Sequence, residues 1–223
     1  MGAKQHEPTD PRLNELYRGL DRLPADLWAD LAVLDPGSVS RRAGVIYRAG
    51  EGYRLPFLNT DHWVDPERRL ISVPRNAGPG AVRPGFQTGL VLLNYLIHAQ
   101  EIGLSGRMVT ARELNGGDLF FQGPHALSTR PVLDRFGRDA PGLVARGMSL
   151  GGTPLKAGLP AGDGAFRIMA LPKILVSYTL YEADEEFEAR LTVTFDAYTD
   201  RHLTLDGIWA LVNVLSHRLA RIP

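Results

Sequence analysis

The fold of this chain is decided by the stretch Phe86-Gln87-Thr88-Gly89-Leu90-Val91-Leu92-Leu93-Asn94-Tyr95-Leu96-Ile97-His98-Ala99-Gln100-Glu101. A helix on a protein surface carries one apolar stripe and one polar face. In this stretch, apolar side chains stand on nearly every face between Leu90 and Ile97. We therefore expect a helix that is buried on most sides and that Gly103 ends. Such a helix belongs at the centre of the protein.

Strand-like segments lie on both sides of this central helix in the sequence. Before it, residues 44–73 alternate in short runs separated by turn residues, which predicts a meander of antiparallel strands. After it, residues 174–181 and 190–195 have strand character, and the acidic residues 182–188 join them as a hairpin loop with a solvated tip. Because strands gather in clusters and helices lie between the clusters, we expect an α+β fold with an antiparallel sheet.

Further helices are expected around the strand clusters. Asp10-Pro11 is typical of a helix start, because Asp caps free amides and Pro fits the first turn. Asp35-Pro36-Gly37 is expected to end that helical region. Thr129–Met148 predicts a helix that Pro141-Gly142 interrupts. Apolar residues at helical spacing predict a closing helix over Thr204–Arg221.

The chain is expected to form one domain. Its 223 residues and 44% hydrophobic content suffice for a core, and no shift in composition separates two parts. Residues 1–9 are polar and are expected to be disordered, so the domain is assigned to residues 10–223. The prediction is a single α+β domain, in which an antiparallel sheet packs with the buried central helix and a C-terminal helix.

Composition excludes several classes of function. The 25 basic and 25 acidic residues give a formal net charge of +0, which argues against broad electrostatic binding to nucleic acid or anionic membranes. Cysteine is absent, which excludes disulfides, thiolate nucleophiles, Cys-ligated zinc and Cys-held iron–sulfur clusters within this chain. The first residues lack the apolar core of a signal peptide, and no apolar run is long enough to span a bilayer, so we expect a cytoplasmic protein.

The best candidate for a site is the segment from Glu113 to His125. It concentrates glycines, two adjacent Phe residues and a histidine where irregular backbone is expected. Phe faces can hold a planar ring and pockets are mostly apolar, so the segment predicts a pocket for a small organic ligand or a planar cofactor. Residues 150–152 and 162–166 are expected to complete it. The expected ligand-binding residues are Glu113, Gly116, Gly117, Phe120, Phe121, Gly123, His125 and Asp163.

Several alternatives remain open for these residues. In an enzyme, His125 would act as general acid or base, with Glu113 or Asp163 within hydrogen-bond reach. In an interaction protein, a homodimer would form through an exposed sheet edge or the surface around Trp209. The segment can also be a packed loop, whose aromatic side chains are core and whose histidine bonds a backbone carbonyl.

Two other motifs have weaker chemistry. His98 and Glu101 are three residues apart and would share a face of the central helix, but no third metal ligand is identifiable, and no metal site is predicted. Residues 147–151 read Gly-Met-Ser-Leu-Gly, but a nucleophilic serine needs a strand before it and a helix after it. Neither context is expected here. The Walker A and G-x-G-x-x-G patterns are absent, so a common phosphate loop is not supported.

The order of several short motifs resembles a bacterial and archaeal family known as domain of unknown function 3786. The matching elements cover roughly residues 44–220 and are Tyr53–Leu58, Leu92–Leu96, Glu113–His125, Phe136–Asp139, Leu150–Gly152, Gly162–Phe166, Asp184–Phe187 and Phe195-Asp196. The family has no established activity, so the resemblance carries over no catalytic residue and no particular cofactor. Its members look common in anaerobes with iron–sulfur and corrinoid chemistry, which implies a cofactor-related role. The planar cofactor expected in the pocket would then be tetrapyrrole- or corrinoid-like.

Overall fold

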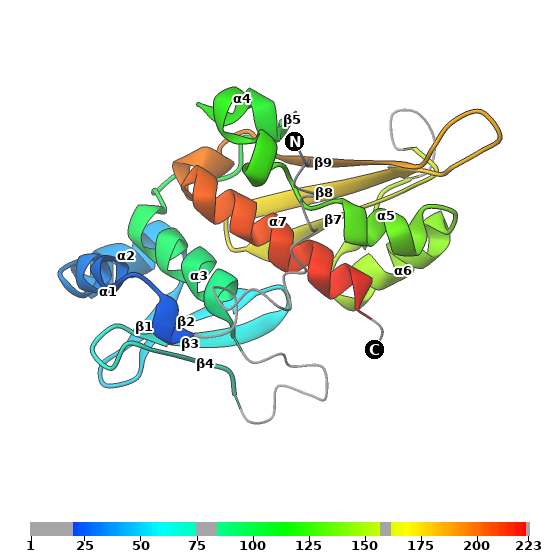
Figure 1. Ribbon diagram of the computed structural model, residues 1–223. Helices are drawn as coiled ribbons and strands as arrows, with labels where there is room; N and C mark the ends of the chain where they lie inside the picture. Colours follow the sequence, from blue (N-terminus) through cyan, green and yellow to red (C-terminus); the bar gives the residue numbers. More distant parts are fainter. Residues whose placement is uncertain (1–19, 75–83, 157–161, 222–223) are drawn as a thin grey trace, which may run out of the picture.

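The computed structural model describes residues 20–74, 84–156 and 162–221, and the predicted N-terminal tail and the helix start at Asp10 lie outside these ranges. These residues form an α+β fold with two antiparallel sheets (Figure 1). One sheet has the order β1 (Ile46–Arg48), β2 (Gly52–Phe57), β3 (Thr60–Asp65) and β4 (Leu70–Ser72). The other has the order β5 (Met108–Thr110), β9 (Arg190–Asp196), β8 (Ile174–Tyr181), β7 (Gly164–Leu171) and β6 (Thr153–Pro154).

The α-helices and 3-10 turns connect and cover these two sheets. The α-helices are α1 (Ala25–Ala32), α2 (Pro36–Ala43), α3 (Phe86–His98), α4 (Gly117–Phe120), α5 (Arg130–Phe136), α6 (Ala140–Ser149) and α7 (Leu205–Ala220). The 3-10 turns are η2 (Leu20–Arg22), η3 (Ala111–Glu113), η4 (Gly123–His125) and η5 (Thr199–Arg201). In Figure 1, α7 crosses one face of the five-stranded sheet, and α3 lies beside it over the four-stranded sheet.

The four-stranded sheet confirms the predicted meander. Each strand pairs antiparallel with the next, and the outward row across the sheet runs from Arg54 through Trp63 to Ser72. The β2–β3 hairpin turns at Leu58 and Asn59, which both have positive φ, as a tight two-residue hairpin loop requires. At the same turn, the amide of Leu58 donates to the carbonyl of Ala170 in β7 at 3.1 Å, which ties the two sheets together.

The five-stranded sheet contains the predicted hairpin and three strands that were not predicted, β5, β6 and β7. β8 and β9 form the expected antiparallel pair, joined by the acidic loop. In that loop, the Asp184 carboxylate accepts the amides of Glu186 and Phe187 at 2.8 and 2.7 Å, which forms its turn. The longest of the missed strands is β7, which pairs with β8 along most of its length. The sequence predicted one antiparallel sheet, whereas the described strands form two.

The central helix is buried as expected. Its residues from Val91 to Leu96 are all buried, and the Tyr95 hydroxyl donates to the carbonyl of Ala43 at 2.7 Å. The helix ends at His98, three residues short of Glu101. The predicted pairing of His98 with Glu101 on one helical face is therefore wrong.

Two predicted helix boundaries need correction. Asp35 ends no long helix but starts a new one, because its carboxylate accepts the amide of Ser38 at 2.7 Å and caps α2. The interruption expected at Pro141-Gly142 lies instead between α5 and α6, and Asp139 caps α6 by accepting the amide of Gly142 at 2.9 Å. Pro141 fits there because the first turn of a helix does not need its amide.

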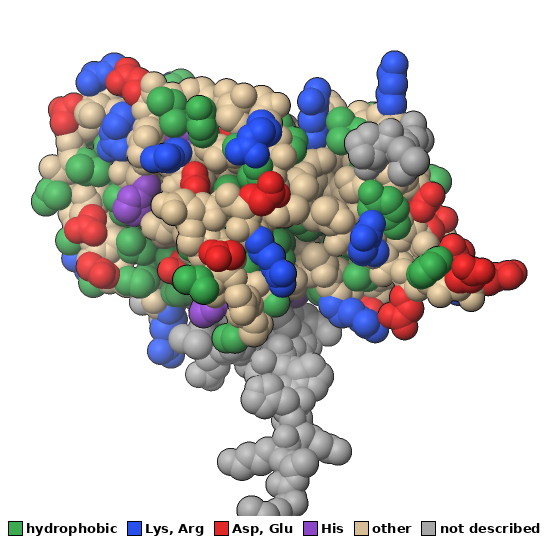
Figure 2. Space-filling model, turned by 90° about the horizontal axis from the view of Figure 1, so that it is seen from above, with side chains coloured by type: hydrophobic (Ala, Val, Ile, Leu, Met, Phe, Trp, Pro, Cys, Tyr) green, Lys and Arg blue, Asp and Glu red, His purple; other side chains and the backbone are tan. Residues whose placement is uncertain are grey.

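Charges of both signs are spread over the surface. Seen from above, acidic side chains gather at one end of the molecule, over the β8–β9 hairpin, while basic and acidic side chains alternate elsewhere on this face (Figure 2). No helix among the described residues is long and apolar enough to cross a membrane.

Candidate functional site

The segment from Glu113 to His125 is a series of short helical turns, η3, α4 and η4. It begins with a capping box, in which the Glu113 carboxylate accepts the amide and the hydroxyl of Thr110, both at 2.8 Å. These two hydrogen bonds lower the pKa of Glu113. The carboxylate therefore holds the entry of the segment, which leaves it poorly placed to act as a proton-transfer partner.

Glycine is required at position 117 by close backbone packing. A Cβ there would lie 1.9 Å from the carbonyl oxygen of Ala111. Gly116 has a φ of 75°, the left-handed conformation that glycine adopts most easily. The concentration of glycines that singled out this segment thus serves its tight folding.

The aromatic side chains of the segment form a cluster on α7. The Phe120 ring stacks on the His125 ring with centroids 4.6 Å apart, and Phe121 meets Phe120 edge-on at 5.1 Å. On its other side, the His125 ring meets Trp209 of α7 at 5.8 Å in an edge-on arrangement. Phe121 is buried, whereas Phe120, His125 and Trp209 are half-buried. The rings pack on one another, and the outer part of the cluster faces solvent.

Asp163 does not join this cluster. It precedes β7, where its amide donates to Leu180 at 2.9 Å and its carboxylate accepts the amide of Glu182 at 2.8 Å. Leu180 pairs with Leu191 at the start of β9, whereas β5, which leads into the aromatic segment, pairs with the end of β9 around Phe195. Along β9, the position near Asp163 (Leu191) and the position near the aromatic segment (Phe195) are four residues apart, or about 13 Å.

The glycine loop after α6 also lies elsewhere. Gly151 packs against Asn59 in the β2–β3 turn, where a Cβ would lie 2.8 Å from the Asn59 Cβ. Ser149 is in the last turn of α6, and its hydroxyl donates to the carbonyl of Arg146 at 2.7 Å. The serine thus lacks the strand-to-helix turn of a nucleophile. A Cβ on Gly152 would lie 3.0 Å from the Phe166 ring, so the structure brings residues 150–152 and 162–166 together. It separates both from the aromatic segment, so the three loops do not build one pocket.

Two acidic residues that were not among the expected site residues hold the aromatic segment and its neighbours in place. Asp200 accepts the amide of Asn115 at 2.9 Å. Asp196 is almost fully buried and accepts four hydrogen bonds at 2.9 to 3.0 Å, from Ser105, Gly106 and Tyr198. Burial raises the pKa of Asp196, but these hydrogen bonds outweigh burial and lower it. Asp196 belongs to the Phe195-Asp196 motif of the family resemblance, and the Asp-x-x-x-Asp spacing after a strand is a second signal in the sequence.

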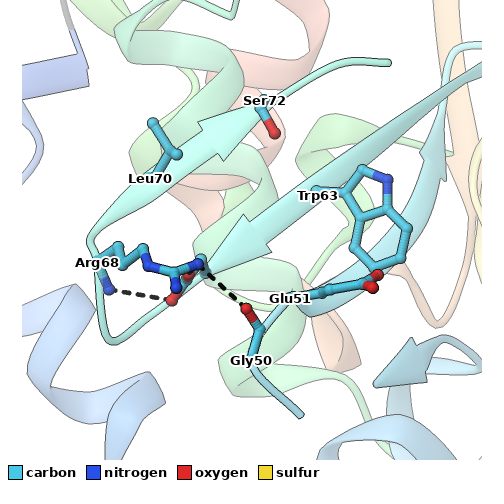
Figure 3. A pocket seen from close by; sticks show the side chains of 7 residues that line it. Gly50, Glu51, Trp63, Arg68, Leu70 and Ser72 are labelled. Atoms are coloured by element: carbon cyan, nitrogen blue, oxygen red, sulfur yellow. Dashed lines mark hydrogen bonds and ion pairs between the residues drawn. The ribbon is translucent and has the colours of Figure 1, made fainter. Parts of the chain in front are cut away.

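A hollow of about 230 Å³ lies on the outward face of the four-stranded sheet, away from the segment predicted from the sequence. Figure 3 shows Glu51 and the Trp63 indole on one side of it and the Arg68 guanidinium on the other. Trp63 and Asp65 face outward from β3 and are cross-strand neighbours of Ser72 and Leu70 in β4. The lining residues are Gly50, Glu51, Trp63, Asp65, Arg68, Leu70 and Ser72.

The charges around the hollow are fixed by local hydrogen bonds. Asp65 accepts both the amide of Arg68 at 3.0 Å and its Nη1 at 3.1 Å, and the same Nη1 donates to the carbonyl of Gly50 at 3.1 Å. Among the described residues, the Glu51 carboxylate contacts only Arg48, at a long 3.5 Å, and the Arg48 guanidinium lies 5.5 Å from the Trp63 ring centroid. The hollow thus presents an indole, a cation and a loosely paired carboxylate.

Comparison with known proteins identifies the family. Residues 35–218, from the cap of α2 to the last turn of α7, match the family described as Domain of unknown function (DUF3786). The chain belongs to the DUF3786 family. The match confirms the resemblance seen in the motifs and includes every residue that lines the hollow. No curated protein and no solved structure matches the chain. Within the described ranges, no group of three His, Asp or Glu side chains is placed to hold a metal ion.

Proposed function

We propose that this DUF3786 protein binds a small zwitterionic organic molecule, of the size of an amino acid, in the hollow of the four-stranded sheet. The supporting observation is that Trp63, Arg68 and Glu51 line one hollow of about 230 Å³. This volume lies just below the range of drug-sized sites, which suits a smaller ligand. The ligand's apolar part would lie on the Trp63 indole.

The charges of the hollow suit the two ends of such a ligand. Arg68 uses Nη1 for Asp65 and Gly50, and a guanidinium has further N–H groups that can donate to a ligand carboxylate. Within the part of the chain that the structure describes, the Glu51 carboxylate is held by one long, exposed contact to Arg48, so it can exchange that partner for a ligand ammonium group. Arg48 near the Trp63 ring shows that a cation is accommodated beside this indole.

The test follows the Trp63 indole N–H in two-dimensional NMR spectra. The resonance is assigned with Trp63→Phe, and amino acids and simple amines are added up to about 10 mM, which detects Kd values near 1 mM. Saturable shifts of this resonance are expected, and Arg68→Gln is expected to weaken binding about tenfold, the loss of one charge-assisted hydrogen bond. Arg112→Gln, an exposed arginine in η3, is the control and should bind as the wild type does. An unmoved Trp63 resonance with every compound would refute the proposal.

A second candidate is the binding of a planar cofactor, such as a tetrapyrrole or corrinoid, at the aromatic cluster. The observation that favours it is the half-buried His125 ring, fixed between Phe120 and Trp209, whose nitrogens have no hydrogen-bond partner among the described residues. Haem and cobalamin titrations test it, because imidazole ligation shifts their visible absorption bands. The shift should disappear in His125→Ala and persist in His98→Ala, which removes an exposed histidine elsewhere. Equal spectra in all three proteins would rule this candidate out.

A general acid–base role of His125 is also still a prediction, but it needs a partner other than Asp163, which lies at the other end of the sheet. Homodimerisation likewise remains a prediction. Of the two expected surfaces, the edge strand β5 is the better candidate for the dimer contact, because its Met108 is 38% exposed. The Trp209 surface is less suitable, because His125 covers part of it. Light scattering should show a dimer that Met108→Lys dissociates, because a charge on an edge strand opposes pairing. A monomeric wild type would exclude it.

A further inference from the structure

The C-terminal end of α7 carries a cation that no described carboxylate neutralises. Arg218 lies in the last turn of α7, and its guanidinium carbon is 5.5 Å from the ring centroid of Phe57 in β2. Phe57 is fully buried and Arg218 is half-buried. Ion pairs form elsewhere in residues 20–74, 84–156 and 162–221, but none of them includes Arg218.

This position is electrostatically unfavourable for a guanidinium. Burial and the neighbouring Arg221 together lower the pKa of Arg218 to about 10. A partly dehydrated cation next to a second cation raises the free energy of the folded protein unless an anion neutralises it. Arg218 has no hydrogen-bond partner among the described residues, yet its nitrogens are not enclosed, so solvent reaches them. The group is therefore open to an anion from solution.

The helix end itself does not explain Arg218. A cation near a helix C-terminus is normally stabilised by the last carbonyl groups. Here two other helices supply those cations. Arg146 of α6 donates to the carbonyl of Arg218 at 2.7 Å, and Arg135 of α5 donates to the carbonyl of Ala220 at 2.9 Å. The side chain of Arg218 is therefore not needed to stabilise the helix end, and it lies over the Phe57 ring instead.

We propose that Arg218, whose guanidinium lies above the ring of Phe57, binds the phosphate group of a small molecule together with the neighbouring Arg221. A guanidinium matches a phosphate in geometry and forms charge-assisted hydrogen bonds with it. The aromatic floor limits the directions in which Arg218 can move, so little side-chain entropy is lost on binding. The site lies next to the β2–β3 turn, at the opposite end of the four-stranded sheet from the hollow, and it does not depend on the ligand proposed there.

Calorimetry with inorganic phosphate and with glycerol phosphate tests this site, with sodium chloride at equal ionic strength as reference. Binding of both is expected if the phosphate group is what the protein recognises, and binding of glycerol phosphate alone would still support the site as one for a phosphate ester. Arg218→Met keeps an apolar chain on Phe57 but removes the charge, and should weaken binding at least about tenfold. Arg138→Met removes an exposed arginine elsewhere and should bind as the wild type does.

The thermal stability of the same variants gives a second readout. Arg218→Met should equal or exceed the wild type in chloride, because a partly dehydrated cation is gone, and should gain no stability when phosphate is added. The wild type should gain stability with phosphate. The proposal is overturned if the wild type binds neither compound, or if Arg218→Met binds phosphate as well as the wild type. Arg68→Gln should leave phosphate binding unchanged, which separates this outcome from that of the hollow.

Discussion

Acidification should destabilise this protein through two histidines that are completely buried. His62 contacts the carbonyl of Thr60 through Nδ1 at 2.9 Å, and His202 accepts the amide of Gln100 through Nδ1 at 3.2 Å. The Nε2 atoms of both rings are buried and have no hydrogen-bond partner in the part of the chain described. Burial is the main cause that lowers the pKa of each ring from 6.5 to about 4, and the charge of Lys173 adds to it at His202.

The size of the effect follows from the protons that each state binds. Between pH 6.5 and about 4, the unfolded chain protonates these histidines while the folded protein does not, so the free energy of unfolding falls as the pH falls. A difference of 6.5 − 4, about 2.5 units, corresponds to about 3 kcal/mol for each ring. The contribution is complete above pH 6.5 and lost below about pH 4. Two rings together would remove about 6 to 7 kcal/mol, a large share of the total stability of an average domain.

Urea unfolding at pH 7, 6 and 5 measures this slope. The variants His62→Asn and His202→Asn keep a polar atom near the Nδ1 position, so the hydrogen bonds to Thr60 and Gln100 can re-form. Each variant should lose less stability than the wild type between pH 7 and 5, and the double variant least. His125→Asn, at a half-exposed position, serves as control. If the double variant keeps the slope of the wild type, the two rings are not the cause of the acid sensitivity.

Two further substitutions test how the candidate segment is held. In urea unfolding, Gly117→Ala should lower the free energy of unfolding by about 2–3 kcal/mol, because its Cβ would meet a backbone oxygen that cannot move aside. The control is Gly103→Ala, where the space is open, and it should change this free energy by less than about 1 kcal/mol. Asp196→Asn should cost about 3 kcal/mol in the same assay, since each carboxylate oxygen accepts two donors and an amide group facing either pair would oppose them; a cost near zero would contradict this.

The elements predicted correctly from the sequence are those with a long and clear period. The central helix, the β8–β9 pair and the closing helix each have enough apolar residues at helical or strand spacing to exclude the other type of secondary structure. β7 was missed although Phe166, Ile168 and Ala170 point inward between Arg167 and Met169, because neighbouring glycines made its start look like a loop. The division into two sheets was not predictable, since strand pairing depends on contacts far apart in the sequence.

The candidate site shows the same limit. Glycines at positions 116 and 117 correctly indicated a tightly folded backbone, because that requirement is local. The partner of His125, by contrast, is Trp209 on the last helix, and nothing near either residue connects them. Asp163 was grouped with the segment on composition alone, and strand register places it at the other end of the sheet. The hollow was not predicted, because it forms from neighbours across strands.

Both proposed binding sites use the four-stranded sheet, and its position in the fold explains this. Its inner side packs under α3, while its outward face exposes polar and aromatic side chains such as Trp63. Asp65, which holds Arg68 in the hollow, and Thr60, which pairs with Phe57 below Arg218, lie at opposite ends of β3, five residues or about 16 Å apart. Sites separated by more than about 10 Å with no shared partner act independently. The losses of binding in Arg68→Gln and Arg218→Met should therefore be specific to one ligand each, which makes the sheet a support for two separate sites rather than a single pocket.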